Sequence, residues 1–417
     1  MKKIRTFFSL ILVLLLLAGC GTQYLGGDRD TKWQKDLSYL KEAIKNKDPY
    51  VYDNISEEEF NSKLKNLKEE VPNLSDNEVV NKIYEIMATV GDAHTKAQKK
   101  FTKKVPLVFS YFQDGFYLIN TIDQYKEGLY CKLKKVNNMD IKEVEKKLEP
   151  LISHENKENV IKTLPNFFVN PEILEGVKIV DNIDTVKFTL EDSNGKEFNL
   201  EVETIDTKNV SEEDKDKYQF IYQDYDETYP LYMQQGTLNY WYKYLEDNKV
   251  LYLKYKVCEE DKESGCIDKI IDEMIELIDE GRVDKFVMDV RENSGGSTHK
   301  FDRLVDKIRQ CNLNERDKFF VIIGRPTFSA AVEDTSNIRE STNATIVGQP
   351  TSMRPNHYGE VTKFELPNSK IMIYCSTKHI TIHEDNGDSL IPDKIIETSI
   401  NDYVEKRDPV MEYIINK

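Results

Sequence analysis

A serine that follows an apolar run is the residue of this sequence best placed to act as a nucleophile. Residues 321–323 predict a buried strand, 324–327 its exit loop, and 329–331 the first turn of a helix. At such a turn the hydroxyl of Ser329 can face solvent beside the free N–H groups of the helix start, which could stabilise an oxyanion. A serine that only caps a helix occupies the same kind of position. Ser329 is therefore either a nucleophile or an N-cap.

Three further patches could supply the rest of a catalytic site. The first is Gly-Asp-Ala-His-Thr at 91–95, which contains His94. The second is DVRENSGG at 289–296, which follows an apolar strand and ends in a double glycine. The third is 347–359, which contains Arg354 and His357. Taken singly, they also fit a surface histidine, a turn and solvated side chains. Loops that follow strands are nevertheless where sites on α/β folds tend to lie.

The order of these four patches resembles the tail-specific, or C-terminal-processing, serine peptidase family. GDAHT is similar to the GDGHT element of that family, DVRENSGG to D-x-R-x-N-x-GG, and TFSAA with GQPT to the T-x-S-A-A and G-E-x-T pair. The resemblance extends over roughly residues 75–400, and Pro392-Asp393 and Asp408-Pro409 also match the end of the family pattern. It implies a serine-type endopeptidase. The expected fold class is α+β and multidomain: a crotonase-like α/β catalytic core, a helical N-terminal bundle and a β-rich PDZ-like middle module.

The resemblance implies one of two proton carriers. In one branch a lysine follows the serine, but the matching position here is Arg354, and arginine has no neutral form with which to accept a proton. In the branch similar to the tricorn core peptidases the base is the histidine of the first element, which corresponds to His94. An acid before Pro392-Asp393 would orient this imidazole. The candidates are Glu384, which is favoured, Asp385 and Asp388.

The implied mechanism is acyl transfer. Neutral His94 would take the proton of Ser329 as the hydroxyl attacks a peptide carbonyl, and would later protonate the leaving amine. The oxyanion would lie between the N–H of Ala330 and that of Gly295 or Gly296. Arg354 and His357 would line the substrate cleft.

The sequence departs from the family pattern at two places near these residues. Ala93 stands where the family has glycine, or serine in the tricorn-like branch, and Ser352-Met353 stand where it has two glycines. Met353 would narrow the passage that those glycines leave open. Neither change removes a proton carrier.

Hydrophobic periodicity predicts the elements that position these residues. Residues 31–100 predict a helical domain of three helices, with Ser56 and Ser75 as N-caps. Residues 101–205 predict a β-rich module with a hairpin turn at Asn194-Gly195 and short helices at 141–148 and 155–163. Residues 206–245 predict a surface connection. Residues 246–417 predict the α/β core: strands at 250–255, 285–290, 319–324 and 344–348 alternate with helices at 267–281, 299–310 and 329–340, and strands follow at 360–366, 370–376 and 379–383.

The N-terminus resembles a bacterial lipoprotein signal peptide. Lys2, Lys3 and Arg5 precede an apolar run from Phe7 to Leu17, and Leu17-Ala18-Gly19-Cys20 is similar to a lipobox. The run is shorter than a bilayer-spanning helix, which argues against an uncleaved anchor. We expect a signal peptide at 1–19, lipidation of Cys20, a tether at 20–30, and a protein anchored to the extracytoplasmic face of the cell membrane.

Composition limits the partners. The formal charge of the 417 residues is −16, and because the first nineteen carry three of the positive charges and no acid, the remainder carries −19. Such acidity argues against nucleic acid as a partner and favours a peptide or protein substrate, while the oligomeric state stays open. No ligand cluster or phosphate loop suggests a metal or an organic cofactor.

Five cysteines remain besides Cys20, an odd number without metal-ligand spacing. Cys258 and Cys266 are close enough in sequence to bridge a loop, although buried free thiols are equally common.

Three functions compete. The first is a lipid-anchored serine peptidase that acts through Ser329 and His94. The alternative is a catalytically inactive, peptidase-like lipoprotein that binds peptides or a protein partner, which the absent lysine and altered glycines would suit. The third, chemistry on a thioester, suits an exported protein less because such a protein meets little acyl-CoA.

Overall fold

The computed structural model describes residues 23–208, 219–221, 226–382 and 387–417. The expected signal peptide, the lipidation site Cys20, part of the 206–245 connection, and the candidate acids Glu384 and Asp385 lie outside the described residues. Within the described residues, no helix is both long enough and apolar enough to cross a membrane.

Three helices form the N-terminal part, as the sequence predicts. They are α2 (Arg29–Lys47), α3 (Glu57–Glu70) and α4 (Asp76–Ala88). Ser56 accepts a hydrogen bond from the N–H of Glu59, and Ser75 forms a capping box with Glu78, so both predicted N-caps are confirmed. Their apolar faces meet in one core through residues such as Leu40, Phe60, Leu64, Val79 and Ile83.

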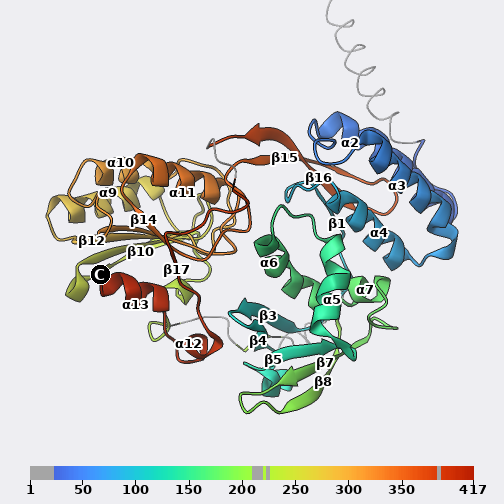
Figure 1. The fold of residues 1–417 in the computed structure, drawn as a ribbon, viewed down its shortest axis with the longest axis horizontal. Helices are drawn as coiled ribbons and strands as arrows, with labels where there is room; N and C mark the ends of the chain where they lie inside the picture. The colour runs from blue at the N-terminus through green and yellow to red at the C-terminus, as the bar shows by residue number, and fades with distance from the viewer. Residues whose placement is uncertain (1–22, 209–218, 222–225, 383–386) are drawn as a thin grey trace, which may run out of the picture.

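An antiparallel sheet, drawn below these helices in Figure 1, makes up most of the middle of the chain. Its order is β3-β4-β5-β7-β8, with β6 paired to β5. The strands are β3 (Leu107–Phe112), β4 (Gly115–Thr121), β5 (Lys132–Val136), β6 (Met139–Asp140), β7 (Thr185–Glu191) and β8 (Glu197–Glu203), accompanied by α5 (Ile141–Leu148), α6 (Lys157–Phe168) and α7 (Pro171–Gly176). The predicted turn at Asn194-Gly195 joins β7 to β8, and Gly195 has a φ of 79°.

Helix α6 runs further than the sequence predicts. The expected helix stopped at residue 163 before Pro165, because proline removes a helical hydrogen bond. In the structure the helix continues through Pro165 to Phe168. Phe168 is fully buried and its ring lies 4.9 Å from that of Phe116, so packing on the sheet outweighs the local cost.

The C-terminal part is a six-stranded, mainly parallel sheet of order β10-β11-β12-β13-β14-β17. Its strands are β10 (Tyr240–Leu245), β11 (Val250–Tyr255), β12 (Lys285–Asp289), β13 (Phe319–Ile323), β14 (Thr345–Gly348) and β17 (Lys394–Ile395). The helices α9 (Ile267–Asp279), α10 (Asp302–Arg309) and α11 (Ala330–Ser341) cover one face, and α13 (Pro409–Ile415) covers the other (Figure 1). β10 was not predicted, since its sequence YWYKYL lies at the end of a segment with weak periodicity.

A hairpin leaves this sheet and joins the N-terminal part. It consists of β15 (His357–Glu365) and β16 (Met372–Ile380), and β16 pairs with β1 (Lys96–Gln98) in the three-stranded order β1-β16-β15. The predicted strands at 370–376 and 379–383 are one strand, β16. Phe364, Ile373 and Cys375 are buried in the same core as the N-terminal helices. Strand β2 (Lys103–Lys104) pairs with β9 (Ile205–Asp206) as a separate two-stranded sheet, and helix α12 (Ile400–Val404) precedes α13.

All five described cysteines are free thiols. Cys258 is buried and its Sγ lies 3.3 Å from Asn293 Oδ1, whereas Cys266 is exposed just before α9. The structure therefore has no Cys258–Cys266 bridge.

Buried charges tie the C-terminal helix to the sheet. Arg291, at the end of β12, contacts Asp289 and donates to both carboxylate oxygens of Asp408, the residue that caps α13. All three side chains are buried. Because a buried ion is costly without its partner, the cluster fixes α13 against the sheet.

We expect Asp408→Asn to lower the free energy of unfolding by about 3 kcal/mol, because asparagine can still cap α13 but leaves the charge of Arg291 partly uncompensated. Urea unfolding followed by circular dichroism measures the change. Glu412→Gln, which breaks an exposed pair with Arg407, serves as the control and is expected to change stability little. Equal, small losses in both variants would contradict the role of the buried cluster.

Candidate active site

Ser329 occupies a strained turn between β13 and α11. Its φ of 54° and ψ of −129° lie outside the regions that a non-glycine residue ordinarily adopts. It stands at the N-cap position of α11, yet its side chain makes no capping hydrogen bond. The residue is half-buried. The capping role that the sequence left open is therefore not the one that the structure shows.

His94 is brought to Ser329 from the other end of the chain. Nε2 of His94 lies 3.1 Å from Oγ of Ser329, although the two residues are 235 positions apart. At this distance the hydroxyl can donate to a neutral imidazole. The ring also packs on Phe328, with centroids 4.6 Å apart.

Asp92 holds the turn that carries His94. Its buried carboxylate accepts the backbone N–H groups of His94 and Thr95 at 2.9 and 3.1 Å, and the hydroxyl of Ser376 in β16 at 2.6 Å. The hydroxyl of Thr95 in turn donates to Asp48, at the end of α2. The position of the imidazole is thus set jointly by the N-terminal helices and by a strand from the C-terminal half.

Burial keeps the imidazole of His94 neutral. It lowers the pKa to about 3, and the nearby His357, Lys96 and Lys162 act in the same direction, while the backbone of Tyr358 opposes them. No described acid forms a hydrogen bond with Nδ1, and Asp92 Oδ1 lies 3.9 Å away. A neutral ring is the form that can accept a proton from a hydroxyl.

The double glycine packs directly against Ser329. A Cβ at Gly295 would lie 2.7 Å from the Cβ of Ser329, and one at Gly296 would lie 2.7 Å from the carbonyl oxygen of Cys258, so only glycine fits at either position. The N–H of Gly295 already donates to Asn293 Oδ1 at 2.9 Å. The first residue of α11 is Ala330, whose N–H has no acceptor within the helix. Gly295 is therefore the glycine nearest Ser329 but has its N–H engaged, whereas Gly296 packs against Cys258.

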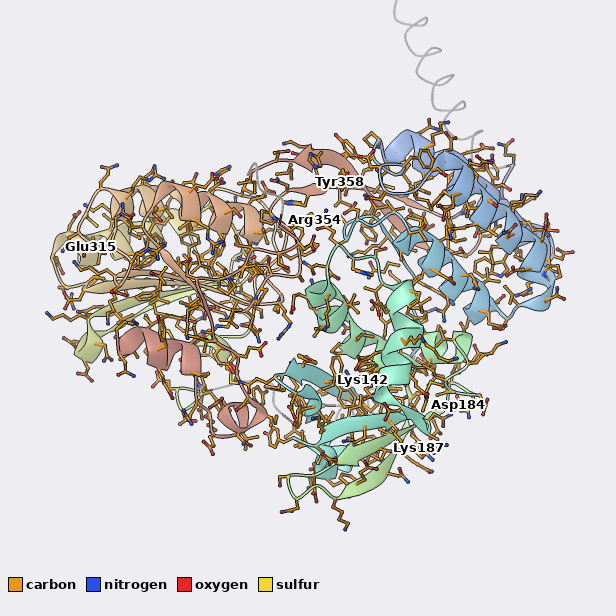
Figure 2. All side chains as sticks on the ribbon, in the orientation of Figure 1. Lys142, Asp184, Lys187, Glu315, Arg354 and Tyr358 are labelled. Atoms are coloured by element: carbon orange, nitrogen blue, oxygen red, sulfur yellow. The ribbon has the colours of Figure 1, made fainter. Side chains whose placement is uncertain are left out.

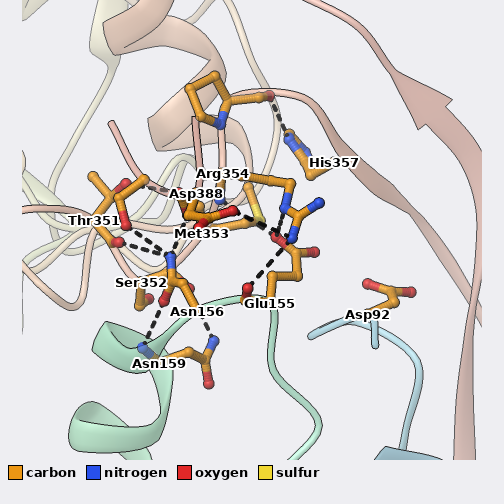
Figure 3. Close-up of polar contacts among 12 residues, drawn as sticks. Asp92, Glu155, Asn156, Asn159, Thr351, Ser352, Met353, Arg354, His357 and Asp388 are labelled. Carbon is orange, nitrogen blue, oxygen red and sulfur yellow. Dashed lines mark hydrogen bonds and ion pairs between the residues drawn. The ribbon is translucent and has the colours of Figure 1, made fainter. Parts of the chain in front are cut away.

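Side chains at the start of α6 hold the loop at 351–354 by hydrogen bonds (Figure 3). Asn156 donates to the carbonyl of Thr351 and to that of Asp388, and Asn159 donates to the carbonyl of Ser352. One turn further along α6, Lys162 donates to the hydroxyl of Ser352 at 2.9 Å. Met353, expected to narrow a passage, is fully buried in the core of the C-terminal sheet instead.

Arg354 and His357 lie near the site but contact other residues. Arg354 lies between the two halves of the molecule (Figure 2), with its guanidinium against Glu155 and Asp388. His357 is buried, donates from Nδ1 to the carbonyl of Pro355, and lies nearly parallel to the ring of His94 at 5.9 Å. Asp388 is 84% exposed and its carboxylate faces Arg354. It is the one described residue among the three candidate acids for orienting His94, and it is directed to the arginine.

Glu155 is a buried acid that the sequence analysis missed. One carboxylate oxygen accepts the N–H of Arg354 at 3.3 Å, while Oε1 is buried with no partner among the described residues. Burial and the neighbouring Asp92 raise its pKa to about 7, against the opposing effect of His357 and Arg354. No sequence signal points to this residue, since its burial arises only when the start of α6 meets the 351–354 loop (Figure 3).

Lys162 and Phe328 were also missed. Lys162 reaches from α6 to within 4.4 Å of the Phe328 ring centroid, which places an ammonium group near His94 and Ser329. Burial lowers its pKa to about 8. Among the residues that the structure describes, no group of three or more histidine, cysteine, aspartate or glutamate side chains could hold a metal ion.

The chain is similar to known proteins in its three-dimensional structure. No protein-family model matches the sequence, and no curated protein matches it either. Mature CPAF complexed with lactacystin matches with a TM-score of 0.62 and 12% identity, over 93% of this chain and 97% of that one. A serine-to-alanine mutant of CPAF matches with a TM-score of 0.64 and 14% identity, over 92% and 96% of the two chains.

The chain has the fold of CPAF. The resemblance to the tail-specific serine peptidases that the motifs predicted is confirmed at the level of an α+β fold. The tricorn protease is similar over 94% of this chain and 37% of its own, with a TM-score of 0.44 and 11% identity.

Glu155 gives a test of the electrostatics. The pKa of its carboxyl is about 7 in the folded protein, above the ordinary value of 4.5, so the folded protein binds this proton more tightly than the unfolded chain does. The resulting contribution to stability is present below pH 4.5 and is lost as the pH rises through 7. We expect Glu155→Gln to change stability little at pH 4.5 and to raise it by about 2 kcal/mol above pH 7. Urea unfolding at both pH values measures this. Glu143→Gln, an exposed position on α5, should show no such divergence, and a Glu155→Gln variant that behaves like it would refute the assignment.

Proposed function

We propose that this protein is a serine peptidase, with Ser329 as nucleophile and His94 as general base. The observation that carries the proposal is the 3.1 Å approach of His94 Nε2 to Ser329 Oγ, at a strained turn that opens a helix. An isolated serine gains little nucleophilicity without such a base. The strain adds support, because backbone strain of this kind is concentrated at functional sites.

In the proposed reaction, His94 accepts the proton of Ser329 as Oγ attacks the carbonyl carbon of a peptide bond. The N–H of Ala330, together with that of Gly295 or Gly296, stabilises the oxyanion, and Gly295 also shapes the turn through its bond to Asn293. His94 then gives the proton to the leaving amine, and water releases the acyl group by the same steps. Glu384, the acid favoured by the resemblance, would accept from Nδ1 of His94, the nitrogen that lacks a described partner.

The proposal extends to the domain organisation. The sheet from β10 to β17, within 246–417, would be the crotonase-like catalytic core, and the sheet from β3 to β8, within 101–205, the PDZ-like module. The helices of 31–100 would form the N-terminal domain, which supplies the base, and 206–245 would connect module and core.

We expect Ser329→Ala and His94→Ala each to lower kcat/KM on a mixed-peptide or casein substrate by about a thousandfold or more, because each removes one member of a catalytic unit. Ser193→Ala and His299→Ala, at exposed positions away from the dyad, serve as matched controls and should keep full activity. Circular dichroism would check that all four variants fold. A folded Ser329→Ala variant that cuts as fast as the parent would sink the proposal.

The second candidate is a peptide-binding protein without catalysis. Two observations favour it: Nδ1 of His94 lacks a described acid partner, and the N–H of Gly295 is engaged by Asn293. Covalent labelling by a fluorophosphonate, or by lactacystin, which forms a complex with CPAF, separates the two candidates. Labelling of the parent but not of Ser329→Ala supports the peptidase, and no labelling of the folded parent supports the binding protein.

We further propose that Cys20 carries a lipid that anchors the protein at the extracytoplasmic face of the cell membrane, as the resemblance of residues 1–20 to a lipoprotein signal peptide implies. The structural matches also include a lipoprotein from Streptococcus agalactiae, with a TM-score of 0.36. The proposal rests on the sequence alone.

Expression in a bacterium with a clickable fatty acid tests the anchor. The full-length parent should take up the label and sediment with membranes, because two or more acyl chains hold a protein stably at a bilayer. Cys20→Ala should lose the label, whereas Cys266→Ala, which removes an exposed thiol, should keep it. Label retained in Cys20→Ala would place the lipid elsewhere.

A further inference from the structure

Two hollows lie near the proposed catalytic pair, one with Lys162 and the other with His94 in its lining, and both are lined by positive charge. The first, of about 630 Å³, lies between β3 of the middle sheet and the ends of the C-terminal strands. Its lining includes Lys162, Lys254, Lys256, Arg291 and Arg325, and the one described acid among its lining residues is Glu292. This is notable in a chain whose net charge is −16.

The second hollow, of about 570 Å³, begins at His94 and follows the solvent face of the three-stranded sheet. Lys96 in β1, Tyr374 in β16 and Lys363 in β15 are paired across the strands, so they form one row on this face. The described lining of this hollow contains two lysines and no acid. Lys96 thus lies in the hollow that begins at His94, while Lys162, in the first hollow, contacts Phe328, the ring on which the imidazole packs.

Most basic groups near the site already have acidic partners. Arg325 pairs with Glu158 and Glu397, Arg291 with Asp289 and Asp408, and Lys254 with Glu292. These basic side chains form ion pairs within the protein. Their charges add little net attraction for a ligand, because the partner carboxylates cancel them.

Lys162 and Lys96 differ from these groups. Lys162 is half-buried, contacts the hydroxyl of Ser352 and the ring of Phe328, and forms no ion pair with a described carboxylate. Lys96 is exposed, two residues after His94, and likewise forms no ion pair with a described acid. An ammonium group that is partly removed from water gains more from a counter-charge than one in open solvent. Lys162 is in that position, whereas Lys96 offers an exposed charge, so each lysine can bind an anionic group of a ligand.

We infer that the substrates are acidic peptides, whose glutamate or aspartate side chains bind Lys96 on one side of the Ser329–His94 pair and Lys162 on the other. This inference rests on the proposed peptidase function, for which it supplies the substrate class. A peptide laid across the pair would enter both hollows, and its backbone would bring one carbonyl to Ser329. Val361, 44% exposed in the second hollow, would contact an apolar stretch of the same peptide.

Equilibrium binding separates this inference from catalysis. Full-length protein carrying Ser329→Ala, in a non-ionic detergent, would be titrated with two labelled peptides that differ only in having glutamate or glutamine at the same positions, each with a free and with an amidated C-terminus. We expect the glutamate peptide to bind about tenfold more tightly in both end forms. Joint Lys96→Gln and Lys162→Gln substitution should reduce the preference to under about twofold.

Lys142→Gln is the matched control, because Lys142 lies on α5 and lines neither hollow (Figure 2). It should leave the tenfold preference unchanged. Lys96→Glu with Lys162→Glu should reverse the preference toward a lysine-containing peptide, which a loss of folding could not mimic.

Equal binding of the two peptides would overturn the inference, as would a preference that disappears on amidation, since the ligand would then be the C-terminal carboxylate. A preference that persists in the double glutamine variant would also overturn it. Because the Ser329→Ala variant is used, none of these outcomes depends on peptide cleavage. Failure of the proposed function would appear separately, as an inactive parent protein that still prefers the acidic peptide.

Discussion

The contact between His94 and Ser329 joins two cores: one contains the N-terminal helices, the middle sheet and the β15–β16 hairpin, and the other contains the C-terminal sheet and its helices. His94 follows the N-terminal helices, and Ser329 opens a helix on the C-terminal sheet. Neither core can form this pair alone, so the geometry depends on how the cores are docked. The β15–β16 hairpin sets that docking: it leaves the C-terminal sheet, pairs with β1 directly after the histidine, and offers Ser376 to the carboxylate of Asp92.

A second set of contacts fixes the other side of the site. The start of α6 grips the 351–354 loop through Asn156 and Asn159, and Arg325, on the loop between β13 and Ser329, pairs with Glu158 in the same helix. Displacement of α6 would therefore move the loop, the turn that carries the serine, and Lys162 together. The middle sheet is thus mechanically connected to the Ser329–His94 pair through one helix, even though none of its strands supplies a member of that pair.

Local patterns predicted much of this architecture. Periodicity and capping residues located the three N-terminal helices, and apolar strands alternating with amphipathic helices predicted the C-terminal sheet, because both signals depend on neighbours within a few residues. Residues whose roles depend on distant segments were missed. The burial of Glu155 requires α6 to meet the 351–354 loop, and β16 reads as two strands until its pairing with both β1 and β15 supports one continuous strand. The motif order located His94 and Ser329, but their 3.1 Å separation follows only from the docking of the two cores.

Arg354 can supply a positive charge at the site but cannot accept a proton. A lysine can give up its proton when it is desolvated, whereas a guanidinium remains charged, so Arg354 can act only as a permanent cation. In the structure it lies against Glu155, whose unpartnered oxygen and neighbouring Asp92 make a second negative charge costly. Arg354 limits that cost and holds the loop to α6. In the proposed mechanism, proton transfer is the role of His94, which burial keeps neutral and whose Nε2 lies 3.1 Å from Ser329 Oγ. An arginine at position 354 is therefore compatible with the proposed site, in which histidine is the base.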